Sequence, residues 1–259
     1  MDEVQKIVPG TIDVLVGAMK DRGFFTYYPE VPSEKDKIET FPTSELVFIL
    51  VSDIGSDAMI NLLLTYGDRE LIPQTTIRQE VKRTLDEQWK KLEFGKVVNE
   101  VIPYLPLEQS HIAQVLRLKI DDMSLEFSSV YWLDLVVDEQ VIRYLSSGSF
   151  IPYLQYKTAK GNKTLTFSKY GARIVDHAGP MQDLRSLLMT YMPPWRPSQV
   201  LVVKVDAFEE DKQQKGYDPN IMLQWCAVDA QSYSTQYKLG HGNKFSTCEL
   251  RWKGKMPTR

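Results

Sequence analysis

The chain has 259 residues, 43 % of them hydrophobic and 25 % charged, which is typical of a globular protein with one large domain or two smaller ones. Its formal net charge of −3 offers no basic surface, so we expect neither nucleic acid nor an anionic membrane as a partner. No apolar run approaches the roughly 18 residues of a membrane span, and the N-terminus lacks a signal-peptide core. We therefore expect no membrane span and a cytoplasmic protein, with an organelle as the alternative.

Two cysteines, Cys226 and Cys248, lie near the C-terminus. They can pair with each other, but they belong to no larger cysteine framework, so a reducing compartment is the default expectation. The histidines at positions 111, 177 and 241 lack the spacing of metal ligands and predict no metal site.

Two carboxylates open the chain. Asp2 and Glu3 stand before residues 4–19, whose apolar residues recur at helical spacing and in which Pro9 can occupy the first helical turn. By themselves these carboxylates are typical of a solvated helix start, which the helix dipole favours.

An unbroken apolar run occupies residues 46–51 and is followed by Ser52 and Asp53. Such a run predicts a strand buried on both faces, as in the middle of a parallel sheet. Ligands bind at the carboxyl ends of such strands, which makes Ser52 and Asp53 candidate site residues. The alternative is that Ser-Asp-Ile-Gly is only the turn into the next helix.

The order of these stretches resembles the AAA+ ATPases of the Clp and torsin group. In that family the Walker B strand ends in Asp-Glu before a Lys-x-x-Pro helix, and the sensor 1 strand ends in a Ser-Asn-x-Gly-Ser pattern. The resemblance implies that Asp2 orients the shell of a Mg²⁺ ion, that Glu3 polarises the attacking water and that Asp53 holds the sensor 1 position. A carboxylate at that position departs from the family, because it cannot donate a hydrogen bond to a γ-phosphate and repels it instead.

Later segments extend the resemblance. Residues 103–111, PYLPLEQSH, resemble the segment that leaves the last core strand and enters the helical lid. Residues 170–173, YGAR, resemble the sensor 2 motif, which implies that Arg173 contacts the β- and γ-phosphates of ATP; a surface salt bridge is the alternative. Lys96 lies where Clp proteins carry an arginine finger, but it lacks the bidentate fork of arginine, and torsins also lack a proper finger.

The remaining patterns predict ordinary elements. The aromatic loop 22–44 either contacts substrate, as the resemblance to Clp pore regions implies, or packs against the core. The segment 157–164, KTAKGNKT, lacks the spacing of a phosphate loop and predicts a turn between extended segments. After a break at residues 68–73 we expect a helical pattern that packs against the core. Further helices are expected at 109–123, 138–146 and 181–192. Strands are expected at 99–103, 200–205, 221–228, 235–239 and 247–252.

The expected fold is α/β, with an incomplete AAA+ parallel-sheet core at residues 1–104, a small helical lid at 105–192 and a β-rich extension at 193–259. The resemblance covers about residues 1–192 and implies ATP and Mg²⁺ as cofactors. It also implies protein substrates and partner AAA+ subunits in a homo-oligomeric ring.

No glycine-rich phosphate loop precedes Asp2, so we expect no ATP hydrolysis by this chain alone. The chain is then either the C-terminal part of a longer Clp-like ATPase that remodels or unfolds proteins, or a catalytically inactive AAA+-derived scaffold that binds partners. A chain without the neighbouring strands should expose residues 46–51 and self-associate.

Overall fold

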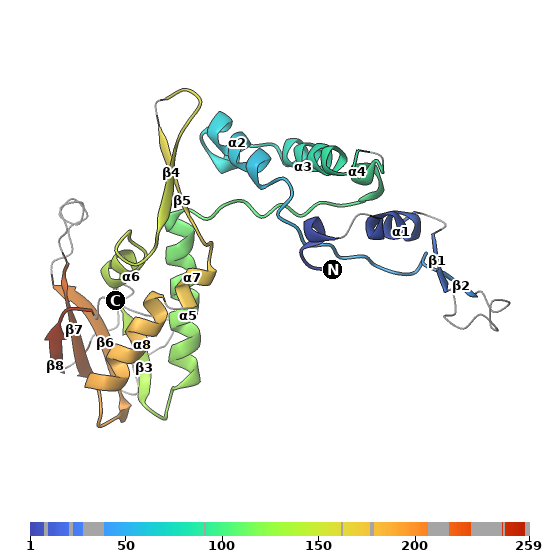
Figure 1. Cartoon of the computed structure of the whole chain (residues 1–259). Coiled ribbons are helices and arrows are strands. Elements are labelled where there is room, and N and C mark those ends of the chain that lie inside the picture. The colour runs from blue at the N-terminus through green and yellow to red at the C-terminus, as the bar shows by residue number, and fades with distance from the viewer. Residues whose placement is uncertain are drawn as a thin grey trace. The chain divides into compact units, whose positions relative to one another are not determined.

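The computed structural model describes residues 1–7, 10–20, 23–27, 39–90, 92–161, 163–176, 179–206, 218–228, 245 and 247–256 (Figure 1). The chain divides into two compact units. Unit 1 comprises Met1–Leu105 with Tyr156–Leu165, and unit 2 comprises Pro106–Gln155 with Thr166–Arg259. The structure is mixed α/β, as expected, and its four-stranded sheet mixes parallel and antiparallel pairs.

Unit 1 is mainly helical. Its described elements are η1 (Val4–Lys6), α1 (Thr11–Ala18), the antiparallel strands β1 (Phe24–Tyr27) and β2 (Glu39–Pro42), α2 (Ser56–Tyr66), η3 (Arg69–Leu71), α3 (Gln74–Gln88) and α4 (Phe94–Val97). The predicted stripe on α3 is confirmed as core, because Ile77, Val81 and Leu85 are buried one turn apart. Gly95 lets α4 approach α3 closely, since a Cβ there would lie 2.4 Å from the carbonyl oxygen of Lys82.

The predicted buried strand at residues 46–51 is wrong. The segment belongs to no assigned strand, and the side chains of Val47 and Ile49 are 86 % and 71 % exposed. Burial on both faces needs covering layers, and on the described part of the chain none covers these side chains. The separate expectation that the chain exposes this segment is confirmed. The predicted strand at 99–103 is likewise absent, with Ile102 and Tyr104 exposed.

Unit 2 is a sheet covered by helices (Figure 1). Its elements are α5 (Gln109–Glu126), β3 (Trp132–Val137), α6 (Glu139–Leu145), α7 (Arg173–Asp176), α8 (Pro180–Tyr191), β6 (Arg196–Asp206), β7 (Asn220–Ala227) and β8 (Thr247–Gly254). The strands lie in the order β3-β6-β7-β8, with β3 parallel to β6 and the other pairs antiparallel. The hairpin of β4 (Tyr153–Lys157) and β5 (Thr164–Ser168) is shared between the two units, and its turn confirms the prediction for KTAKGNKT.

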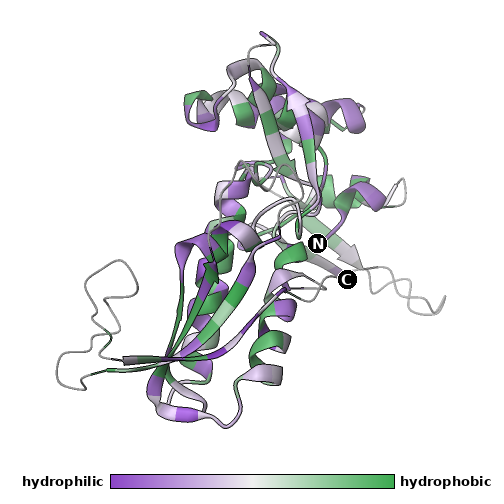
Figure 2. Ribbon diagram, turned by 90° about the vertical axis from the view of Figure 1, so that its left-hand side faces the viewer, coloured by the Kyte–Doolittle hydropathy of each residue, from purple (hydrophilic) through white to green (hydrophobic). Residues whose placement is uncertain are grey.

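Alternation along β6 builds two apolar clusters. Leu201 and Val203 join the large core formed with α5, α6 and α8, whereas Val200 and Val202 form a smaller cluster with Val136 and Cys226. The helices facing the large core are amphipathic, and hydrophobic and hydrophilic residues alternate along them (Figure 2). The predicted helices and strands of this unit are therefore confirmed, apart from residues 235–239, which lie outside the described residues.

The strand β3 is not predicted from the sequence. Asp134 interrupts its apolar pattern, yet this side chain is 4 % exposed. Its carboxylate accepts hydrogen bonds from the Ser124 hydroxyl at 2.5 Å and from the Leu135 N–H at 2.8 Å, which offset the cost of burial. Strand β3 follows the first helix after residue 106, and it pairs with β6, the first of the C-terminal strands. The predicted boundary at 192/193 therefore lies inside one compact unit.

Among the described residues, no helix has both the length and the hydropathy that crossing a bilayer requires.

Two tyrosines of unit 2 make its stability depend on pH: Tyr144 is fully buried and Tyr153 is partly buried. Burial and the hydrogen bond to Asp218 raise the pKa of Tyr144, and burial raises the pKa of Tyr153, whose hydroxyl donates to the Ser146 carbonyl at 2.5 Å. In the unfolded chain both ionise near pH 10. Their contribution to stability is therefore complete below about pH 10 and is lost as the pH rises further.

Tyr153→Phe tests this. The variant loses about 1 kcal/mol of unfolding free energy at neutral pH, because a hydrogen bond is removed. Its deficit relative to the wild type should shrink above pH 10, as measured by urea unfolding across the pH range. Tyr170→Phe, at an exposed position, is the control. A deficit that stays constant with pH would contradict the assignment.

The exposed segment 46–51 predicts self-association. Light scattering should show species larger than the monomer, and Val47→Glu combined with Ile49→Glu should restore the monomer by charging this surface. Leu71→Glu, which charges an isolated leucine that is 64 % exposed, should leave association unchanged. A monodisperse wild-type monomer would contradict the prediction.

Candidate functional site

The first residues of the chain lie along residues 49–53. The Met1 amino group donates to the Ile49 carbonyl at 2.7 Å, and the Val51 N–H donates to the Met1 carbonyl at 2.8 Å. Two bonds that bracket one residue in this way are the pattern of a parallel pair. A third bond, from the Val4 N–H to the Val51 carbonyl at 3.1 Å, joins the same segments one residue out of that register, and Glu3 between them has a φ of 56°. These bonds bring Glu3 and Gln5 to Ser52 and Asp53.

Gln5 links the two segments through its side-chain amide. Its NH₂ group donates to the Glu3 carboxylate at 2.5 Å and to the Asp53 carboxylate at 3.5 Å. Its carbonyl oxygen accepts from the Ser52 hydroxyl at 2.8 Å and from the Asp53 N–H at 3.4 Å. One amide therefore holds the ends of both segments in register.

The turn after Asp53 leads directly into α2. The Ser52 hydroxyl accepts from the Ile54 N–H at 3.1 Å, and the Ser56 hydroxyl donates to the Asp53 carbonyl at 2.6 Å. Gly55 precedes α2 with a φ of 92°, a conformation that favours glycine. Asp53 thus stands one turn before a helix N-terminus, where the dipole favours negative charge.

An open depression adjoins this turn. It is lined by residues 53–58, by Asn61, and by Arg83, Thr84 and Glu87 of α3. The guanidinium of Arg83 is already paired with Glu80 and Glu87, and these carboxylates raise its pKa. The depression therefore presents carboxylates and a neutralised cation.

The carboxylates fit the role that the resemblance gives them with respect to Mg²⁺. Among the described residues, no group of three or more metal-ligating side chains lies together. Mg²⁺ that arrives with a nucleotide needs only one or two protein carboxylates, since phosphates and water complete its shell. The Asp2 carboxylate, which accepts from the Glu3 N–H at 2.9 Å, supplies an oxygen donor of this kind.

The same place is less suited to binding phosphate groups. Lys6 is the cation beside Glu3, and its Nζ lies 3.1 Å from the Glu3 carboxylate in an exposed ion pair. Asp53 adds negative charge where the family has a neutral donor.

Lys96 and Arg173 have other surroundings. Lys96 is on α4, and its Nζ lies 2.7 Å from Glu93; this hydrogen bond raises the pKa of Lys96. Arg173 belongs to unit 2, where it begins α7 with an exposed side chain. It forms no ion pair with another described residue. Of the residues predicted for the site, the structure links Glu3 and Asp53 through Gln5, and Asp2 adjoins Glu3 in the chain.

Gln5 is the site residue that sequence reasoning missed. Its position in the Lys-x-x-Pro stretch carries no special pattern, because an amide two residues from Glu3 is common on helix starts. Only the pairing with Ser52 and Asp53 shows what it does.

Comparison with known proteins finds a similarity that extends over part of the chain. No family model matches the chain. It is 29 % identical over 126 residues to the chaperone protein ClpB of Yersinia enterocolitica. The match covers 46 % of this chain and only 14 % of the length of that relative. Part of the chain is thus similar to a Clp chaperone.

Gln5→Leu tests the arrangement. Removing the amide should loosen the pairing by about 1.4 kcal/mol in total, which accelerates exchange of the Val4 and Val51 amides about tenfold. Lys6→Met removes only the exposed ion pair and should change neither amide. Unchanged exchange in Gln5→Leu, measured by NMR, would show that the backbone bonds hold the segments unaided.

Proposed function

We propose that the chain is the C-terminal part of a Clp/torsin-type AAA+ module, which acts in ATP-dependent remodelling of proteins within a homo-oligomeric ring. The observation that supports this most is the backbone bonding of Met1 and Val4 to residues 49–51, which together with the Gln5 amide sets Glu3 beside Ser52 and Asp53. The similarity to a protein named as a chaperone gives independent support.

The residues take the following roles in this proposal. Bound Mg²⁺–ATP would supply the reacting phosphoryl group and the charge that neutralises it. The Asp2 carboxylate orients water in the metal shell. The Glu3 carboxylate orients the attacking water and accepts its proton, and Gln5 holds this carboxylate in place.

Asp53 changes the balance between nucleotides. A carboxylate at the sensor 1 position raises the energy of the state with a γ-phosphate, because two negative charges about 4 Å apart repel by about 1 kcal/mol even in water. The same carboxylate has less effect on a nucleotide without a γ-phosphate. The proposal therefore includes a preference of this site for ADP over ATP.

Arg173 and Lys96 have different roles in this proposal. Arg173 supplies an exposed guanidinium, the group suited to bidentate phosphate contact. Lys96 is paired with Glu93, so we assign it no role toward a neighbouring subunit.

A second candidate is a catalytically inactive AAA+-derived scaffold. Asp53 and the Lys96–Glu93 pair favour it, because both remove a group that phosphoryl transfer uses. In this candidate the fold presents surfaces to protein partners, and nucleotide is not required.

Asp53→Asn separates the two. If the site faces a γ-phosphate, the substitution removes the repulsion and provides a donor. Titration calorimetry with magnesium and a slowly hydrolysed ATP analogue should then show about five- to tenfold tighter binding, with little change for ADP. Asp13→Asn removes the same charge from the exposed face of α1 and is the matched control.

Tighter ATP binding in Asp53→Asn alone, reversed by the further change Arg173→Ala, supports the nucleotide module. ATP binding that Asp53→Asn leaves unchanged contradicts the role proposed for Asp53. No nucleotide heat in either protein fits both a part without its phosphate loop and the inactive scaffold.

A further inference from the structure

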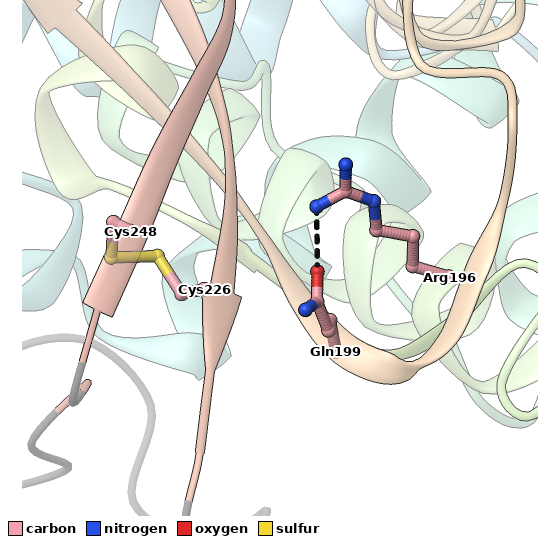
Figure 3. Close-up of a disulfide and its surroundings, with 4 residues drawn as sticks. All are labelled: Arg196, Gln199, Cys226 and Cys248. Atoms are coloured by element: carbon pink, nitrogen blue, oxygen red, sulfur yellow. Dashed lines mark hydrogen bonds between the residues drawn. A yellow bond between two sulfur atoms is a disulfide. The ribbon is translucent and has the colours of Figure 1, made fainter.

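A disulfide joins the last two strands of the sheet. Cys226 on β7 and Cys248 on β8 are directly opposite in the strand register, and their sulfur atoms are bonded (Figure 3). Strand β8 is at the edge of the sheet, so it has a hydrogen-bonded neighbour on one side only. This position makes the disulfide a candidate for holding the edge strand.

The ladder between β7 and β8 is interrupted by a bulge. Leu223 pairs with Trp252, whereas Gln224 pairs with Leu250, which leaves Arg251 as the extra residue. The edge strand therefore has two separately paired parts, residues 247–250 and residues 252–254. Either part can open without breaking the ladder of the other.

The second part is anchored in the large core. Trp252 stacks on Tyr191 of α8 with ring centroids 4.7 Å apart. Met256, just beyond the strand, is 2 % exposed and belongs to the same core. These contacts keep the C-terminal part of β8 on the sheet whatever the state of the cysteines.

The first part is anchored less firmly, with Phe245, just before it, packed partly buried against the small cluster. All side chains of residues 247–251 are exposed. The ion pair between Glu249 and Arg196, at 2.7 Å, is also solvent-accessible, and exposed pairs contribute little. Arg196 donates at the same time to Gln199 on its own strand, so it is not committed to β8 (Figure 3).

We propose that the Cys226–Cys248 disulfide is a reducible latch, which holds residues 247–250 on the sheet and releases them when a dithiol reduces it. Its formation requires oxidising conditions, in contrast to the reducing compartment that the cysteine count suggested.

The reduction has one accessible point of attack. Cys248 is exposed, whereas Cys226 is fully buried beside Val136, Val200 and Val202. A thiolate of the reductant attacks the Cys248 sulfur, the Cys226–Cys248 bond breaks, and Cys226 leaves with the electron pair and takes a proton. The second thiol of the reductant then attacks its own mixed disulfide, which releases Cys248 and oxidises the reductant to a cyclic disulfide.

The burial of Cys226, the leaving sulfur, decides which class of reductant opens the disulfide. Apolar surroundings disfavour the Cys226 thiolate, so the first step is slow and reversible. A monothiol leaves the mixed disulfide open to re-attack by Cys226. A dithiol resolves the mixed disulfide by forming its own cyclic disulfide, so a dithiol is the class of reductant that opens the latch.

Release uncovers a defined surface. Gln224–Ala227 lose their neighbours on β8, so the backbone of β7 becomes an open edge. The small cluster of Val136, Val200 and Val202 lies beside this edge, because Cys226 of β7 belongs to it.

Hydrogen–deuterium exchange with mass spectrometry tests the latch on the intact chain. Dithiothreitol should accelerate exchange at residues 247–250 and 224–227 by about tenfold or more, since the cross-link no longer restrains the strand. Residues 252–254 of the same strand should not change and provide the internal control. Glutathione at equal thiol concentration should have a much smaller effect.

Variants separate the latch from general instability. Cys248→Ser retains the buried Cys226 and should show the reduced pattern without any reductant, and dithiothreitol should then have no further effect. Glu249→Gln, which removes only the ion pair, should retain the oxidised pattern. Unchanged exchange after complete reduction, or equal acceleration at residues 252–254, would overturn the proposal.

Discussion

The parallel pairing of β3 with β6 is the constraint on which unit 2 depends. Parallel neighbours need a long crossover, and here residues 138–195 provide it, with α6, the β4–β5 hairpin, α7 and α8. Because both ends of the crossover are fixed in the sheet, its helices are held over one face, where they bury the large core. Arg173 lies within this crossover, so the only residue with the sensor 2 signature is carried by a connection rather than by a strand of the sheet.

The candidate site in unit 1 is held by weaker interactions than the core of unit 2. The candidate site rests on backbone bonds between residues 1–4 and 49–51 and on one amide, that of Gln5, in largely exposed surroundings. Each such bond contributes about 1 kcal/mol, far less than the burial of a core side chain such as Leu135. The carboxylates are thus positioned by polar contacts that are sensitive to their neighbours. The exposed apolar residues beside them, Val47 and Ile49, make this the surface where association should be strongest.

Edge protection differs between the ends of the sheet. At one edge, β3 is secured by the buried network of Ser124 and Asp134, which no solvent reagent reaches easily. At the other, the first part of β8 depends on a disulfide with one exposed sulfur. The same sheet therefore combines a permanent edge with one whose pairing depends on thiol chemistry.

The sequence by itself determined most helices and most strands of unit 2, because apolar residues at a period of 3.6 or 2 mark faces that must be buried. Its motifs also pointed to Asp2, Glu3 and Asp53, of which Glu3 and Asp53 share a hydrogen-bond partner in Gln5. Only the tertiary structure decided the rest. Strand β3 was not predicted because Asp134 interrupts its apolar pattern. The buried carboxylate is tolerated there because the Ser124 hydroxyl donates a hydrogen bond to it. The apolar run at 46–51 suggested burial, but burial requires covering neighbours that lie outside the pattern itself. The role of Gln5 and the opposition of Cys226 to Cys248 both depend on residues brought together by folding, and spacing along a chain does not encode that proximity.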